Sequence, residues 1–316
     1  MAGGAIWVGA AALPLLAALA PILPAWLISI ATIAFANALV VLGLVVLWRV
    51  GLVSFGQALY YAIGAYAVAL LARFLFVSDA FVLVLVSGSL AGFIAFLVGF
   101  LLARYREIFF AMLSLAISMI LYGVLVKTET LGSTDGFNVP PATFLGYAPH
   151  GHALDLALFW LTLGVAATAA SLVSVYFRSI AGALAVPVRD NEIRVEFLGV
   201  SVNRMIHAKL IIAGALGGIG GALAALAIGH VDPNMAYWTT SGGFVFVTIL
   251  AGAASVAAAF VGSLAFELLR SFAVDLMPDT WQIVLGSALL LTILFLPDGL
   301  GSIFSRRAGA EEAPTP

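Results

Sequence analysis

The chain has 316 residues, of which 64% are hydrophobic and 9% charged, and its mean hydropathy is +1.18. Soluble domains are nearer half apolar and a quarter charged, because a domain folded in water must cover itself with polar groups. The composition therefore excludes a soluble enzyme, and a formal net charge of −2 offers no basic excess for nucleic acid. The absence of cysteine excludes disulfides, thiolate metal sites and a cysteine nucleophile.

Apolar runs follow one another along the chain, and roughly 20 apolar residues are enough for a helix to cross the hydrocarbon core. The first run lacks the Lys or Arg of a signal peptide, so we expect a retained span rather than a cleaved leader. Cutting the runs at charges and at Pro/Gly clusters predicts spans at 5–23, 25–47, 52–72, 80–103, 108–127, 153–177 and 206–229, followed by apolar stretches at 241–273 and 281–297.

The stretch 241–273 is too long for one ordinary crossing, and small residues interrupt it at 252–255. Lys and Arg gather in cytoplasmic loops, so charge bias can decide between one pass and two. Two passes leave only Arg73, Lys127 and Arg270 outside. The sequence therefore predicts an all-α, polytopic transmembrane helical bundle of about ten membrane segments with both termini cytoplasmic. The piece near 241–255 is expected to be broken or re-entrant.

The chain is predicted to form one transmembrane domain, residues 1–303, followed by a disordered cytoplasmic tail, 304–316. Only two internal loops are long: an external loop, 128–152, and a cytoplasmic loop, 178–205. Functional residues concentrate on such loops. These two loops are therefore the first candidates for contact with other proteins.

The cytoplasmic loop contains the pattern of a short amphipathic helix. Pro187 suits a first helical turn and Gly199 suits the C-terminal cap, with charged and apolar side chains mixed between them. Such a helix fits a groove on a soluble protein partner. A helix lying at the lipid interface is the alternative, although its nearly balanced charge disfavours that role. No Walker A pattern occurs, so ATP-driven transport would need another subunit.

Polar side chains inside the apolar spans are candidates to line a translocation path. Such groups are costly in lipid and turn toward the protein interior or a cavity. Satisfied interhelical hydrogen bonds would explain them equally well. These candidates are Asn37, Ser54, Gln57, Tyr60 and Tyr61.

Two small-xxx-small pairs, Gly214/Gly218 and Gly217/Gly221, lie in one predicted helix and allow close helix approach. They suit either a sliding interface or, as we favour, tight static packing. Glu267 is three residues before Arg270, a spacing that predicts a structural ion pair on one helix face.

Other sites receive little support. No arrangement of side chains predicts a metal site, and no catalytic signature occurs. Few ionisable residues lie deep in the predicted membrane region, which disfavours a proton relay.

Short motifs follow a fixed order between about residues 40 and 301. They are Val53-Ser54-Phe55-Gly56-Gln57, Ala62-Ile63-Gly64-Ala65-Tyr66, Phe109-Phe110-Ala111-Met112 with Ser114-Leu115-Ala116, Thr134-Asp135-Gly136, Arg189-Asp190-Asn191-Glu192, Gly199, Lys209, the Gly217–Gly221 cluster, Pro233, Ser241-Gly242 and Pro297-Asp298-Gly299-Leu300. In these motifs the chain resembles the LivM-type permease subunits of ABC importers for branched-chain amino acids. Glu107 and Ala251-Gly252 depart from the family pattern and leave the substrate less defined.

The resemblance implies a non-catalytic subunit that forms the path for branched-chain amino acids or a related small solute. It implies a bacterial or archaeal cytoplasmic (inner) membrane, two cytosolic ATPase subunits that hold ATP and Mg²⁺, a second related permease and a periplasmic substrate-binding protein. No cofactor is expected in this chain. The alternative is a stand-alone channel or secondary carrier for a small polar solute, which would not need the 185–199 loop.

The resemblance also assigns roles to residues of the two long loops. On the external loop, Thr134, Asp135 and Gly136 are candidates for docking the binding protein, with solvated loop residues as the alternative. The coupling helix, seated on the ATPase, would carry Arg189, Asp190, Asn191, Glu192, Arg194, Glu196 and Gly199.

Overall fold

The structure of the chain is a computed structural model that describes residues 20–252 and 255–295. Its longer helices are α2 (Ala25–Trp48), α3 (Gln57–Phe74), α4 (Ala80–Leu102), α5 (Glu107–Lys127), α6 (His152–Arg178), α10 (Val202–Ile228), α11 (Trp238–Ala251), α12 (Val256–Leu276) and α13 (Trp281–Phe295). Its short elements are η1 (Ala20–Ile22), η2 (Glu129–Leu131), β1 (Phe137–Asn138), α7 (Ile180–Ala183), α8 (Ala185–Asp190), α9 (Glu192–Phe197), β2 (His230–Val231) and η3 (Pro233–Ala236).

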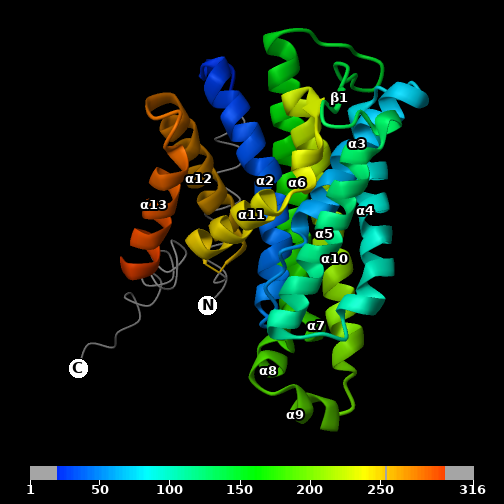
Figure 1. Ribbon diagram of the computed structural model, residues 1–316, viewed down its shortest axis with the longest axis vertical. Coiled ribbons are helices and arrows are strands. Elements are labelled where there is room, and N and C mark those ends of the chain that lie inside the picture. The colour runs from blue at the N-terminus through cyan, green and yellow to red at the C-terminus, as the bar shows by residue number, and fades with distance from the viewer. Residues whose placement is uncertain (1–19, 253–254, 296–316) are drawn as a thin grey trace.

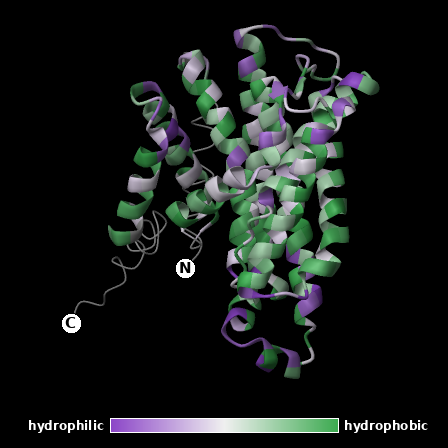
Figure 2. Ribbon diagram, viewed as in Figure 1, coloured by the Kyte–Doolittle hydropathy of each residue, from purple (hydrophilic) through white to green (hydrophobic). Residues whose placement is uncertain are grey.

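The bundle has two ends of different construction (Figure 1). At one end the chain between α6 and α10 forms α7, α8 and α9; we call this the α8–α9 end. At the opposite end β1 pairs with β2 in antiparallel register, Phe137 facing Val231; we call this the β end. Figure 2 shows hydrophilic residues gathered mainly at these two ends and apolar residues between them. This distribution is typical of a protein whose middle lies in hydrocarbon.

In the part of the chain that the structure describes, six helices are long and apolar enough to cross a membrane: α2, α4, α5, α6, α10 and α12. The predicted spans 25–47, 80–103, 108–127 and 153–177 agree with their helices within a residue or two. The predicted span 206–229 begins four residues late, because α10 starts at Val202. About ten membrane segments are not confirmed. The predicted span 5–23, apart from its last residues, lies outside the described residues, as do positions 296–297, the Pro297–Leu300 motif and the tail 304–316.

The predicted span 52–72 is displaced in the structure. α3 begins only at Gln57, and residues 52–56 before it are not helical. α3 is also not among the six helices that are long and apolar enough to cross a membrane. Apolar composition alone cannot separate an extended stretch packed inside the bundle from the first turn of a helix.

The predicted interruption at 252–255 is confirmed. α11 ends at Ala251, Gly252 follows with φ +76°, and Ser255 caps α12 by accepting a hydrogen bond from the Ala258 amide at 3.2 Å. With 14 residues, α11 is about 21 Å long. That length is short of a hydrocarbon core of about 30 Å.

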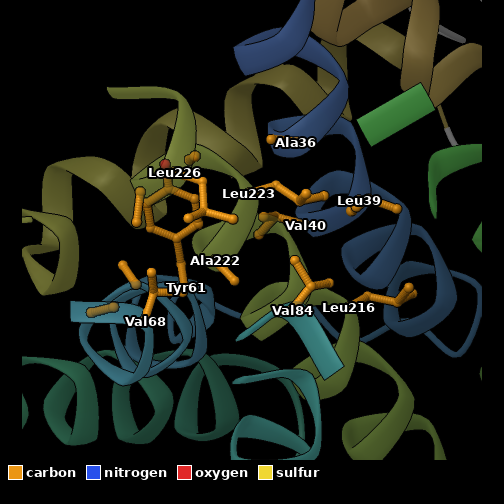
Figure 3. Close-up of a cluster of buried hydrophobic side chains, with 14 of the residues drawn as sticks. Ala36, Leu39, Val40, Tyr61, Val68, Val84, Leu216, Ala222, Leu223 and Leu226 are labelled. Atoms are coloured by element: carbon orange, nitrogen blue, oxygen red, sulfur yellow. The ribbon is translucent and has the colours of Figure 1, made fainter. Parts of the chain in front are cut away.

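α10 is the central helix of the bundle, in extensive contact with α2, α3 and α4. Figure 3 shows the apolar cluster where these helices meet, with Leu39 and Val40 from α2, Tyr61 from α3, and Leu223 from α10. Because lipid tails are as apolar as these side chains, close packing rather than water exclusion favours this association.

The four predicted packing glycines lie where α10 approaches its neighbours. A Cβ at Gly214 or Gly218 would meet Ala95 or Ala91 of α4, and one at Gly221 would meet the Tyr61 carbonyl of α3. Gly217 lies against the side chains of Gln57 and Tyr60 on α3. The two small-xxx-small pairs therefore serve two different neighbours.

Candidate functional site

The segment predicted as one coupling helix is two short helices. Asn191 separates α8 from α9, with φ −162° and ψ 99°, and its side-chain oxygen accepts a hydrogen bond from the Arg194 amide at 3.0 Å. This is an N-cap, and it begins a new helix instead of continuing the old one. Pro187 lies in the first turn of α8, and Gly199 follows α9 with φ +84°. One continuous helix over 188–198 was therefore wrong.

The α8–α9 segment has an anchored side and an exposed side. Val188 and Val195 are buried in an apolar cluster with residues from the ends of α4 and α10. Phe197 and Leu198 point outward, with 88% and 76% of their surface exposed. Six of the seven predicted coupling residues are exposed as well: Arg189, Asp190, Asn191, Arg194, Glu196 and Gly199.

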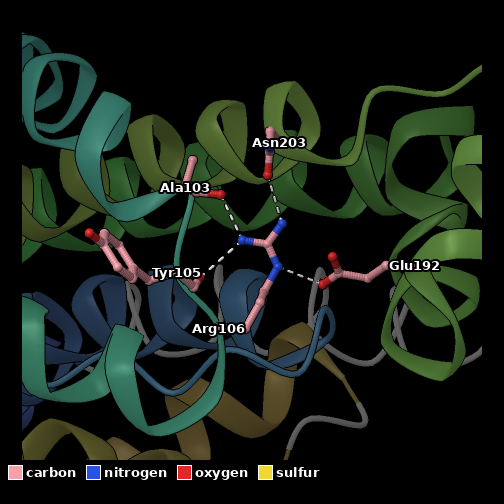
Figure 4. A network of polar contacts seen from close by, with 5 residues as sticks. All are labelled: Ala103, Tyr105, Arg106, Glu192 and Asn203. Carbon is pink, nitrogen blue, oxygen red and sulfur yellow. Dashed lines mark hydrogen bonds and ion pairs between the residues drawn. The ribbon is translucent and has the colours of Figure 1, made fainter.

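Glu192 differs from those six residues, because its side chain pairs with a distant part of the chain. Its Oε1 receives a hydrogen bond from Arg106 Nε at 2.6 Å, and the two side chains are 34% and 25% exposed (Figure 4). The same guanidinium donates to the Ala103 carbonyl at 2.6 Å, the Tyr105 carbonyl at 3.0 Å and Asn203 Oδ1 at 2.8 Å. Sequence reasoning used Arg106 only as one of the charges that set orientation.

Three of the predicted path residues lie at the start of α3. Ser54 Oγ accepts from the Gly56 amide at 3.2 Å. Gln57 and Tyr60 are buried, and neither the Gln57 amide nor the Tyr60 hydroxyl has a hydrogen-bond partner in the part of the chain that the structure describes. The hydrogen bond of Ser54 is therefore local rather than interhelical. Gln57 and Tyr60 keep unused polar groups inside the bundle.

Two serines from other helices accept hydrogen bonds from backbone amides at the start of α3. Ser114 of α5 accepts from the Phe55 amide at 3.1 Å, and Ser241 of α11 accepts from the Ala58 amide at 3.0 Å. The sequence placed both serines within motifs but gave no reason for them. Unpaired backbone amides are costly at membrane depth, and that cost supplies the reason.

The other two path candidates lie on α2 and α3. Asn37 of α2 lies near the Glu267 carboxylate of α12, and its side-chain oxygen has no hydrogen-bond partner among the described residues. The Tyr61 ring lies 5.1 Å from that of Phe244. The predicted ion pair is confirmed, with Arg270 donating to Glu267 at 3.1 Å. Four of the five path candidates thus lie in the first turns of α3 or just before it, and the fifth, Asn37, lies on α2.

Lys209, from the motif series, is fully buried in α10. Its ammonium lies 4.9 Å from the centre of the Tyr176 ring and has no hydrogen-bond partner among the described residues. The nearby Arg49 guanidinium lies 3.9 Å from the Phe177 ring. Lys209 and Arg49 thus both make cation–π contacts with aromatic rings of α6.

The external-loop residues lie at the β end. Thr134 and Asp135 are exposed, and their side chains share a hydrogen bond of 3.3 Å. Gly136 has φ +68°, and a Cβ there would collide with the Val231 carbonyl. Gly136 therefore shapes the loop, while its two neighbours offer polar groups to solvent. Within residues 20–252 and 255–295, no group of three or more acidic or histidine side chains could hold a metal ion.

The chain matches the family model described as "Branched-chain amino acid transport system / permease component" over residues 5–294, so it belongs to that family. A curated relative is "High-affinity branched-chain amino acid transport system permease protein LivM" of Escherichia coli (strain K12). It is 27% identical over 302 residues, covering 86% of this chain and 69% of that protein. The protein of the same name from Salmonella typhimurium (strain LT2) matches with the same identity and coverage. No solved structure matches the chain.

The protein is thus a LivM-type permease subunit of an ABC importer. It is an integral membrane protein and a non-catalytic transport component, and ATP hydrolysis takes place in a partner subunit. These comparisons favour the importer over the stand-alone channel or carrier.

Proposed function

We propose that this chain and a second, related permease subunit form the translocation path for branched-chain amino acids or a related small solute. The substrate class is supported by the family description and by the names of the two LivM relatives. The remaining partners are two cytosolic ATPase subunits and a periplasmic binding protein, in a bacterial or archaeal cytoplasmic membrane. ATP and Mg²⁺ belong to the ATPase subunits.

The α8–α9 end faces the cytoplasm and both termini lie there, by the distribution of Lys and Arg. The β end then faces outward, where exposed Thr134 and Asp135 offer polar groups to a binding protein. Substrate would pass near the polar residues at the start of α3 and near Asn37 of α2.

The observation that carries the coupling role is the exposed apolar pair on an anchored segment. Phe197 and Leu198 are exposed beside buried Val195. Large apolar side chains that project from a fixed segment are typical anchors of protein interfaces. α8 and α9 also carry exposed charged residues, which suit the polar rim of an interface.

Affinity purification from the native membrane in mild detergent, with mass spectrometry of the retained proteins, tests the proposal. We expect the wild type to retain ATPase subunits and a second permease. Phe197→Asp should lose the ATPase subunits, because truncating an anchor removes about 2 kcal/mol or more, on the order of 30-fold in affinity. The second permease should remain bound.

Leu145→Asp is the matched control, because Leu145 is 85% exposed at the β end. It should retain the ATPase subunits and the second permease. A wild type that purifies alone would contradict the proposed assembly. ATPase retention by Phe197→Asp at the wild-type level would place the ATPase contact elsewhere and favour lipid as the neighbour of α9.

A further inference from the structure

α5 is the least buried of the six spans. Its buried residues are few: Phe110, Ser114, Ser118 and Leu125. Most of its surface therefore does not pack against the rest of the chain. The position of α5 therefore depends on a few polar contacts.

The first of these contacts lies at the start of the helix. Arg106 is the N-cap residue of α5, with extended backbone, φ −131° and ψ 164°. Its guanidinium joins Glu192 of α9 to Asn203 in the first turn of α10 (Figure 4). The carbonyls of Ala103 and Tyr105 hold the same group from the α4 side. Every contact of the guanidinium is thus to an acceptor that stabilises its position.

The other contacts lie further along α5 and bind the backbone just before α3 and α11. Ser114 Oγ accepts from the Phe55 amide at 3.1 Å, in the stretch before α3. Ser118 Oγ donates to the Ala236 carbonyl at 2.8 Å, at the end of η3 and just before α11. Through these bonds, Ser114 holds the backbone just before α3, and Ser118 holds the backbone just before α11. The first residue of α3 is the buried Gln57.

We propose that Arg106 is the positioning residue that makes α5 follow the α8–α9 segment, so that movement of this segment reaches the start of α3. The inference rests on the proposed function, in which the ATPases move α8 and α9. Glu192 then acts inside the chain rather than at the ATPase surface, unlike exposed Arg189 and Glu196. α10 needs no such contact, because it continues directly from α9 through residues 198–201.

The geometry indicates which substitutions separate this role from simple stability. Lys at 106 keeps the charge but lacks the planar fork that reaches four acceptors in different directions. Exchanging the two charges, as Arg106→Glu with Glu192→Arg, restores attraction between the segments but not the bonds to Asn203 and the carbonyls. Partial recovery is therefore the signature of a positioning ion pair.

The test uses the complete importer in proteoliposomes, with substrate uptake and ATP hydrolysis measured on the same preparation. Arg106→Glu and Glu192→Arg should each retain the ATPase subunits and hydrolyse ATP, while uptake per ATP falls at least about tenfold. The double exchange should recover at least about a third of wild-type coupling. Arg104→Glu, the same charge change at an exposed neighbour, should stay within about twofold of wild type.

Two results overturn the inference: wild-type coupling in either single variant, or a double exchange no better than the single variants. A wild type without ATPase subunits would instead contradict the proposed function itself, so the two failures are distinguishable.

A second measurement covers the case in which charge reversal prevents folding. The natural chain has no cysteine, so Arg106→Cys with Glu192→Cys creates its only two thiols. A short bismaleimide should restore coupling to this variant when it bridges the two positions. Coupling that is unchanged after complete bridging, or already at the wild-type level before bridging, overturns the inference.

Discussion

α10 and α5 are both apolar enough to cross a membrane, yet α10 is mostly buried within the chain and most of α5 is not. In its most apolar stretch, 67% of α10 is buried within the chain, against 22% of α5. Glycines of α10 lie against the backbone and side chains of three neighbours, whereas Gly123 of α5 has no atom near the place of a Cβ. Two spans of similar hydropathy therefore differ in kind. One is fixed by close packing, and the other is positioned by a few polar contacts.

The largest effect is expected when one glycine of α10 and one glycine of α5 are each replaced by leucine. Gly221→Leu should greatly reduce the yield of folded protein, because even a Cβ would collide with the Tyr61 carbonyl and overpacking costs about 1–3 kcal/mol or more. Gly123→Leu should be neutral or slightly stabilising, since glycine is a poor helix former. Size-exclusion chromatography in detergent measures both, and equal profiles would remove the distinction between the helices.

A smaller effect is expected from the polar contacts of α5. Ser114→Ala leaves the Phe55 amide without its acceptor, and an unsatisfied buried donor costs about 1–3 kcal/mol. The thermal midpoint of the purified protein should fall. Ser89→Ala is the control, because its exposed hydroxyl bonds only the Leu85 carbonyl of its own helix. A midpoint that falls equally in both variants would mean that Ser114 does not hold α5 in place.

The smallest effect is local to the α8–α9 segment. Asn191→Ala removes the cap of α9, a loss of about 0.5–2 kcal/mol that should stay within the segment. Hydrogen exchange of the α9 amides should accelerate while global melting is unchanged. Asn191→Asp should retain slow exchange, because aspartate caps equally well. Unchanged exchange in the alanine variant would argue against the break between α8 and α9.

The sequence predicted those parts of the fold that depend on local composition. Four spans agree closely, and the break after Ala251 follows from a run of small residues. Hydropathy is read one segment at a time, which is why these features were accessible. The glycine spacing of α10 also indicated close approach, although not which helix each pair would meet.

What the sequence could not predict depends on contacts between distant segments. Arg106 and Glu192 are 86 positions apart, so nothing local marks them as partners. Asn191 could equally have continued a helix, and only the tertiary position of α9 decides that it caps instead. The late start of α3 depends on serines of α5 and α11, which supply acceptors that a helical turn would otherwise provide.

Those serines have a further consequence. In a soluble protein, water satisfies the first amides of a helix; here hydroxyls from three parts of the chain do so for the region around α3's first turn. If α5 withdraws, the Phe55 amide loses its acceptor, and hydrocarbon offers no replacement. Only entering water or an incoming polar solute can take that place. Separation of α5 therefore favours hydration of this point, because a dry open state carries the cost of an unsatisfied donor, about 1–3 kcal/mol.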